Sequence, residues 1–436
     1  MQPSTHRYFL TLAFPNVLAN LVLPLANMID LAILGHLSEA TPLAGAAIAG
    51  VVFDIIYLSL NFLRIGTTGL TALSFGAQNK EASAAVFFRG MAIALVAGIT
   101  IVFLQTPIKN LGFSILTQDP AVGNAGMAYY SARIMGAPAA LGSYVIIGWL
   151  LGRQKSKAVL LLTFILSVAN IFGDWLFILK WDMGAAGAGL ATMISEYLVF
   201  FSGLLMVKTA WGDLPQFRLA WLTGGFRPLF KLQANILIRT LCLTSTFSLF
   251  TYISGRIDTQ TLTANTVLLR LLQAAALFID GYAFALEAMT GRLHGAGDKG
   301  AVRGALRIAM GWNVGTVLIF ILAFSLFGDH IIHRLITYRD AADLAIKWMP
   351  LLCITLAISG FAYILDGLFI GMAAGGLLRS SMLISTLFGF LPLAAWSMIT
   401  GDPQILWSAL ILFMIFRAST LGRKAWGLNE NSSHGQ

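Results

Sequence analysis

The sequence predicts an all-α polytopic membrane protein with 12 transmembrane helices in two parallel repeats of six. Three observations favour this fold class. Only 11% of the 436 residues are charged, against about 25% in a typical soluble protein, and 58% are hydrophobic. The apolar residues fall in runs long enough to cross about 30 Å of hydrocarbon as a helix. Sequence features also recur at a constant spacing in the two halves of the chain.

Twelve apolar runs, separated by polar or glycine-containing turns, are the predicted spans. Each is expected to be a helix, because backbone polar groups in hydrocarbon must be satisfied within the segment. The first run is expected to be a retained span, since it is too long for a signal peptide. The predicted spans are 10–34, 43–68, 86–107, 123–151, 158–180, 185–207, 229–253, 262–288, 304–327, 345–371, 376–400 and 404–422.

The Lys and Arg residues of the short connecting segments predict the orientation. With the N-terminus inside, the inner segments hold most of them, among them Arg153, Lys155 and Lys157. The outer segments hold few, such as Lys109 and Lys180. Both termini are therefore expected in the cytoplasm. The same placement accounts for the net charge of +9, so no nucleic-acid partner is expected.

An internal repeat divides the chain. A shift of 219 residues places Gly148 on Gly367 and Gly152 on Gly371, and it also aligns Thr71 with Thr290. Six spans in each half leave both halves with the same orientation, as in transporters that bind substrate near the interface of parallel repeats. The expected domains are an N-terminal bundle over 1–207, a cytoplasmic linker over 208–226 and a C-terminal bundle over 227–436.

Charged residues inside the spans are the functional candidates, because such a charge costs roughly 3 kcal/mol on insertion scales. Asp30, Asn170, Asp174 and Thr192 are predicted to lie at one depth in the outer half of the first bundle. Apolar surroundings disfavour the charged form of a carboxyl, and two close carboxyls titrate as a pair. The group could therefore exchange protons. The alternative is a pair of interfacial aspartates that merely meet water.

The other intramembrane charges form a second candidate set, a substrate or gate network. Acids outnumber bases within the spans, which favours cationic solutes and protons. Arg133, Arg239 and Arg270 are expected to neutralise acids or to fix bundle packing, and a structural role is also open for Arg64. The candidate substrate or gate residues are Asp54, Arg64, Glu196, Asp280, Glu287 and Asp366.

Motifs of soluble enzymes are missing from the sequence. There is no phosphate-binding loop of the Walker type, so the chain does not encode ATP-driven transport. The six histidines show no metal-ligand spacing, and neither Cys242 nor Cys353 lies in a metal motif. We therefore expect a transporter and not an enzyme, with no catalytic residues, no metal and no cofactor. A passive scaffold or channel stays open at this stage.

Stretches in both halves of the sequence form a set of family motifs: 29–37, 62–72, 133–139, 148–152, 170–174, 279–288 and 365–371. They resemble the multidrug and toxic compound extrusion (MATE) transporters, and most closely their DinF subfamily. The resemblance implies two lobes around a central V-shaped cleft, and export of amphipathic, often cationic, compounds in exchange for protons. It maps a proton site onto Asp30 and Asp174, with Asn170 and Thr192 as supporting polar groups and Tyr129 near them.

One departure from the family pattern concerns sodium. Sodium-linked relatives rely on acids in spans 7 and 10, whereas span 7 here contains Arg239 and no acid, although Asp366 lies in span 10. A sodium-coupled antiporter stays an alternative, as does a flippase for lipid-linked sugars. The excess of acids argues against the flippase, whose pyrophosphate ligand needs a basic cavity. We expect a monomer in the bacterial cytoplasmic (inner) membrane, with a small amphipathic substrate and H⁺ as partners.

Overall fold

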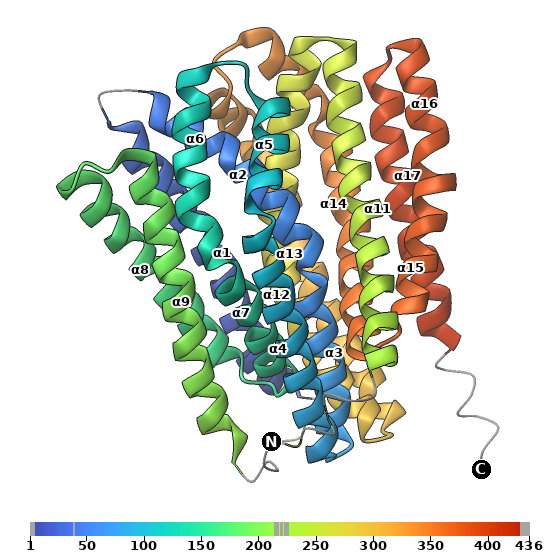
Figure 1. The fold of residues 1–436 in the computed structure, drawn as a ribbon. Helices are drawn as coiled ribbons and strands as arrows, with labels where there is room; N and C mark the ends of the chain where they lie inside the picture. Colours follow the sequence, from blue (N-terminus) through green and yellow to red (C-terminus); the bar gives the residue numbers. More distant parts are fainter. Residues whose placement is uncertain (1–4, 38–39, 213–217, 219–220, 222–225, 428–436) are drawn as a thin grey trace. The chain divides into compact units, whose positions relative to one another are not determined.

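The computed structural model describes residues 5–37, 40–212, 218, 221 and 226–427. Over these residues the regular elements are helices, without a strand (Figure 1). Within the same residues, 12 helical segments are long and apolar enough to cross a membrane, and each overlaps one predicted span. The predicted all-α polytopic membrane fold is therefore confirmed.

The chain divides into two compact units. Unit 1 comprises Met1–Val17 and Lys231–Gln436, and unit 2 comprises Leu18–Phe230. The first helix, α1 (His6–Gly35), therefore contributes residues to both units. The predicted boundaries at 207 and 227 stay a prediction. Much of the predicted linker, namely 213–217, 219–220 and 222–225, lies outside the described residues.

The N-terminal part of α1 packs within unit 1. The ring of Phe9 lies 6.1 Å from that of Tyr282, centroid to centroid. Arg292 donates a hydrogen bond from Nη1 to the Tyr8 hydroxyl at 3.2 Å. A Cβ added at Gly281 would lie 2.7 Å from the backbone nitrogen of Val17, so the two helices approach closely there. These contacts explain why residues up to Val17 belong to unit 1 although they open the chain.

Unit 2 continues with the remaining N-terminal helices. The short helix after the third span, over 105–116, was not predicted, because its 12 residues are too few to cross a membrane. The core of the unit surrounds Trp149, which is fully buried and stacks on Trp211 at 5.5 Å between centroids. The helices are α2 (Thr41–Leu60), α3 (Phe62–Gly76), α4 (Lys80–Phe103), α5 (Gln105–Leu116), α6 (Pro120–Arg133), η1 (Ile134–Gly136), α7 (Ala137–Gly152), α8 (Ser156–Asp174), η2 (Trp175–Lys180) and α9 (Gly184–Trp211).

Unit 1 contains the helices of the C-terminal half, with α11 belonging to it from Lys231 onward. Helix α12 packs along both α13 and α14, and α14 packs on α17. Trp407 of α17 is fully buried and donates its Nε1 hydrogen to Oδ1 of Asn265 at 2.9 Å. The helices are α11 (Phe226–Ile257), α12 (Thr259–Gly295), α13 (Lys299–Leu335), α14 (Arg339–Gly371), α15 (Gly375–Ile384), η3 (Ser385–Phe390), α16 (Leu391–Thr400) and α17 (Pro403–Gly427).

The two units repeat the same helix contact. A Cβ at Gly148 of α7 would lie 2.5 Å from the carbonyl oxygen of Arg64, and a Cβ at Gly367 of α14 would lie 2.5 Å from that of Ala283. The 219-residue shift relates both the glycines and the carbonyls. Only glycine permits so close a backbone approach. The shift found in the sequence therefore corresponds to an equivalent helix crossing in each unit.

The turns between helices repeat as well. Gln154 and its counterpart Ala373 both have positive φ, at 61° and 54°. The N-cap side chain of α4, Asn79, accepts from the backbone nitrogen of Ala82, and the N-cap of α13, Asp298, accepts from that of Ala301. These side chains satisfy a backbone donor that the first turn of a helix leaves unpaired. The repeat is thus preserved in turn and cap geometry as well as in glycines.

One element breaks the repeat. Spans 5 and 11 each contain a π-helical segment, but at different points. In unit 2 the segment η2 follows Asp174, whereas in unit 1 the segment η3 follows Ile384. The 219 shift would place the counterpart of Asp174 at Leu393, beyond the end of η3. Residues of span 11 that follow η3 therefore face a different direction from their counterparts in span 5, which precede η2.

Candidate functional site

Asp30, Asn170 and Asp174 come together in unit 2, as predicted from their depth. Asn170 donates a hydrogen bond from Nδ2 to Oδ2 of Asp174 at 3.1 Å, one turn apart on α8. The carboxyl of Asp30, on α1, lies within hydrogen-bonding reach of both side chains. Asp174 is 1% exposed, and Oδ1 of each aspartate is buried without a hydrogen-bond partner. The three side chains bring a buried carboxyl, that of Asp174, and a half-buried one, that of Asp30, together beside one amide.

The two other predicted members of this group have different partners. The Thr192 hydroxyl donates to the carbonyl oxygen of Ala188 on its own helix at 3.0 Å. The Tyr129 hydroxyl accepts a hydrogen bond from Nη1 of Arg133 at 3.0 Å. Tyr129 is thus joined to the site through an arginine. The supporting role of Thr192 stays a prediction.

Arg133 is the centre of the surrounding polar network. Its guanidinium lies 4.4 Å from the ring centroid of Phe53 and 5.6 Å from that of Tyr57. It also acts electrostatically on Asp30 and Asp54. Aromatic faces attract a cation, and a desolvated contact of this kind contributes about 2 kcal/mol. The arginine is therefore held by rings and lies near several acids without forming a close pair with any of them.

Glu196 lies beside Arg133, with 4.0 Å between its Oε1 and Nη2 of the arginine. Glu196 is 8% exposed, and its Oε2 has no hydrogen-bond partner. A Cβ added at Gly136 would lie 2.1 Å from that oxygen. Gly136 ends η1, the 3-10 turn between α6 and α7. A glycine at this break leaves room for a buried carboxylate that a side chain would displace.

Asp54 and Arg64 occupy less enclosed positions in unit 2. Asp54 is exposed on α2. Arg64 donates from Nε to Oδ1 of Asn61 at 3.2 Å, which holds it beside the junction of α2 and α3. Neither residue belongs to the Asp30–Asp174 group. Their predicted part in a substrate or gate network is untested.

The buried acid of unit 1 is neutralised, in contrast to the pair in unit 2. Oδ2 of Asp366, on α14, accepts from Nη2 of Arg239 on α11 and from Nη2 of Arg417 on α17. The Arg417 guanidinium also lies 5.0 Å from the ring centroid of Tyr363. Arg417 is 1% exposed and Asp366 is 4% exposed. Arg239 of span 7, which was expected to neutralise an acid, pairs with Asp366, and Arg417 pairs with the same oxygen.

Asp280 and Glu287 lie on α12 of the same unit. Glu287 is fully buried, and its carbonyl oxygen lies 2.3 Å from the position of a Cβ at Gly371. Asp280 is half-buried and acts electrostatically on Tyr363. Arg270 donates to Oε1 of Gln273 at 3.4 Å. The network predicted for these residues stays a prediction.

Two functional candidates were missed from the sequence. Arg133 was expected only to neutralise acids or to fix bundle packing, yet it links Tyr129, Glu196 and the aromatic side chains. Arg417 was not among the candidates, but it lies buried within α17. Arg417 falls inside the predicted span 404–422, so its position in an apolar run was the available signal. The described residues contain no group of three or more His, Cys, Asp or Glu that could hold a metal ion.

Comparison with known sequences decides the family. The profile of the MatE family matches residues 15–176 and again residues 236–396, which together cover most of the chain. The chain belongs to the MatE family. One match lies in each half of the chain, as expected for an internal repeat. A MatE protein is a membrane transporter and not an enzyme, so the chain is a multi-pass transporter of small molecules.

The relatives of this MatE protein support the DinF resemblance. DNA damage-inducible protein F of Escherichia coli (strain K12) is 32% identical over 424 residues, covering 95% of this chain and 91% of that protein. Multidrug and toxin extrusion protein 1 of Homo sapiens is 23% identical, over 94% of this chain and 73% of that protein. The chain is therefore similar along nearly its whole length to a bacterial DinF protein.

Solved structures share the fold of the MatE chain. A crystal structure described as MATE in the bent conformation has a TM-score of 0.88 at 19% identity, covering 99% of this chain and 98% of that one. A transporter of the MOP superfamily from Pyrococcus furiosus has a TM-score of 0.86 at 18% identity, covering 99% and 96%. At these identities the likeness concerns the fold alone.

Proposed function

We propose that the protein is a secondary active antiporter that exports amphipathic, cationic organic compounds in exchange for protons by alternating access. The observation that carries the proposal is the buried pair of Asp30 and Asp174 beside Asn170. A buried carboxyl pair is more stable with a bound proton than with two negative charges. Such a pair binds and releases protons as its exposure to water changes.

Exchange follows if protons and substrate favour different states of the transporter. A ligand shifts a conformational equilibrium only through its differential affinity for the two states. Proton binding at Asp30 and Asp174 would then weaken substrate binding, and substrate binding would weaken proton binding to the same extent. Proton entry from outside would release substrate outward. Arg133, Tyr129 and Glu196 would transmit the change, since their network also acts on Asp30.

Sodium coupling through unit 1 has less support. A Na⁺ site needs oxygen ligands, whereas Oδ2 of Asp366 already accepts from two guanidinium groups. The resulting cluster has an excess of positive charge and would repel a cation. We propose protons as the coupling ion for this reason. We also propose the bacterial inner membrane as the location, a monomer as the working form and cytoplasmic termini.

The test is efflux from sealed vesicles that contain the purified protein and a fluorescent amphipathic cation. A pH gradient and a sodium gradient are imposed separately, each with and without a membrane potential. We expect the pH gradient alone to drive transport. Movement driven only by sodium would replace the proton assignment. Translocation of a lipid-linked pyrophosphate, without movement of the cation, would favour the flippase.

A further inference from the structure

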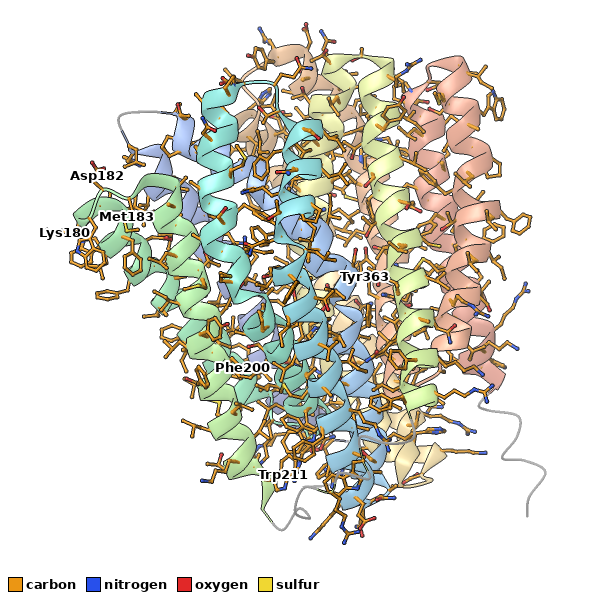
Figure 2. The ribbon with its side chains drawn as sticks, viewed as in Figure 1. Lys180, Asp182, Met183, Phe200, Trp211 and Tyr363 are labelled. Carbon is orange, nitrogen blue, oxygen red and sulfur yellow. The ribbon has the colours of Figure 1, made fainter. Side chains whose placement is uncertain are left out.

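One end of unit 2 contains a polar pocket that has no part in the carboxyl site. The pocket has a volume of about 460 Å³ and lies where α3, α7 and α9 end and α4 begins. Trp211, at the last turn of α9, marks this end, and Lys180 lies at the far end of the same unit (Figure 2). We propose that this pocket binds a phosphate-type oxyanion, presented by a lipid headgroup or by free phosphate.

The charges around the pocket favour an anion. Lys80 and Arg153 line it, and its described lining includes no acidic residue. The nearest acid along α4, Glu81, is engaged on the exposed surface by Arg218, with 3.1 Å between Oε1 and Nη1. The N-terminal end of α4 also opens at the pocket, and the partial positive charge of a helix N-terminus attracts anions.

Two buried polar atoms at the pocket lack partners. Ser83 is 4% exposed, and its Oγ has no hydrogen-bond partner. Its carbonyl oxygen, in contrast, accepts from Nε1 of Trp149 at 3.3 Å. Nε of Arg153 is likewise buried without a partner. An unpaired buried polar group costs roughly 1–3 kcal/mol. A bound oxyanion would accept from both groups and remove that cost.

The Arg153 guanidinium is held in place by aromatic faces. It lies 4.7 Å from the ring centroid of Trp149 and 5.5 Å from that of Phe75. Burial lowers the pKa of Arg153 from its ordinary value, because the charged form is desolvated. Stacking fixes the plane of the guanidinium without supplying a counter-ion. Such a pre-oriented arginine is suited to recognise phosphate or carboxylate geometry.

The internal repeat shows that the fold does not require these residues. At the 219 shift Ser83 becomes Val302, Arg153 becomes Met372 and the N-cap Asn79 becomes Asp298. The backbone of the turns is nevertheless the same, with positive φ at Gln154 and at Ala373. Unit 1 therefore builds the same corner with apolar and acidic side chains at these three positions, while Lys80 recurs as Lys299. The serine and the arginine of unit 2 are additions to the scaffold.

The ligand chemistry follows from this set. A phosphate group offers several oxygens to a guanidinium, a hydroxyl and a helix N-terminus at once. Trp211 and the basic residues are side chains typical of a membrane–water interface. On the proposed orientation this end faces the cytoplasm, where anionic lipids attract basic residues. A lipid headgroup and free phosphate share this chemistry, so the experiment must separate them.

The experiment measures thermal unfolding of the full-length protein in a non-ionic detergent. Inorganic phosphate is titrated against sodium chloride of equal ionic strength. Dihexanoyl phosphatidylglycerol is titrated against dihexanoyl glycerol, which lacks the phosphate. We expect a saturable rise of the unfolding midpoint with a phosphate-bearing probe. Stabilisation by phosphatidylglycerol alone would identify a lipid headgroup, and stabilisation by inorganic phosphate as well would identify a site for free phosphate.

Variants make the assignment specific. Arg153→Met and Ser83→Val introduce the residues that the repeat has at these positions. We expect binding to weaken about 10- to 100-fold in Arg153→Met and about 3- to 10-fold in Ser83→Val. Lys157→Met, which removes an exposed cation from the first turn of α8, is the matched control and should bind as the original protein does.

Either of two outcomes would overturn the proposal. One is the absence of stabilisation by both phosphate-bearing probes. The other is a binding constant in Arg153→Met equal to that of Lys157→Met. The unfolding midpoint of each variant without ligand is recorded first, so that a misfolded variant is recognised. In that case native mass spectrometry of Ser83→Val with phosphatidylglycerol gives the decision, since a serine-to-valine change preserves side-chain shape.

Discussion

The two units share a backbone arrangement, but their intramembrane carboxyl groups have different partners. In unit 2, Asp30 and Asp174 lie together, and an oxygen of each lacks a hydrogen-bond partner. In unit 1, two arginines from different helices converge on a single oxygen of Asp366. The repeat therefore preserves the packing of the helices but not the arrangement of charges. One unit places two carboxyls side by side, while the other pairs a single carboxyl with two guanidinium groups.

The largest expected effect concerns the acid of unit 1. Asp366→Asn would leave two buried guanidiniums without a carboxylate and should destabilise the protein by about 3–5 kcal/mol. Asp174→Asn should cost far less, because it removes a negative charge from beside another acid. Denaturant unfolding in mixed micelles measures both.

A second variant makes this contrast sharper. Adding Arg417→Met to Asp366→Asn should recover part of the lost stability, since one uncompensated charge disappears. Equal losses in Asp366→Asn and Asp174→Asn would mean that the two units do not differ as described.

The next effect concerns coupling. Asp30→Asn should abolish the dependence of substrate affinity on pH, a coupling of about 1–3 kcal/mol or about 5- to 150-fold in affinity. Substrate binding to the purified protein at several pH values measures it. Asp182→Asn, which changes an exposed acid in the turn before α9, is the matched control. A pH dependence that survives in Asp30→Asn would remove this residue from the proton site.

The shared frame has its own test. Gly148→Ala and Gly367→Ala should each cost about 1–3 kcal/mol, because each added Cβ would meet a backbone carbonyl of the crossing helix. Gly311→Ala, in α13, meets open space and should be neutral or slightly stabilising. Denaturant unfolding compares the three. A large cost in only one unit would break the equivalence of the two crossings.

The smallest effect concerns the helix caps. Asn79→Ala and Asp298→Ala each remove an acceptor for the first turn of the following helix, and each should cost about 1 kcal/mol. Similar losses would support equivalent turns in the two units. Asn79→Asp, which copies the cap of unit 1, should retain the stability. If Asn79→Asp were as unstable as Asn79→Ala, the capping account of this turn would be wrong.

Much of the fold was predictable because a membrane restricts the alternatives. Long apolar runs must be helices, and a constant shift between glycines reveals repeated close crossings. The meeting of Asn170 and Asp174 followed from helical spacing, since residues four apart share a face. The proximity of Asp30 followed from its depth in the first span.

Other parts of the site depended on tertiary contacts that no local pattern encodes. The position of Arg133 against Phe53, and of Glu196 beside Gly136, requires the packing of α2, α6 and α9. The second arginine on Asp366 comes from a helix 51 residues away in sequence. The short helix α5 was missed because its 12 residues are too few for an argument that searches for membrane-spanning runs.

The unequal placement of η2 and η3 limits what could be transplanted between the halves. A π-helical turn accommodates an extra residue, and one residue turns an α-helix by about 100°. In span 11 this rotation falls over Ser385–Phe390, which contains Gly389 and precedes Leu393, whereas in span 5 it comes after Asn170 and Asp174. Asparagine and aspartate grafted at 389 and 393 would therefore project from a different side of the helix. The pairing of Asn170 and Asp174 therefore cannot be reproduced in unit 1 by copying residues alone; the point at which the helix is underwound would have to move as well.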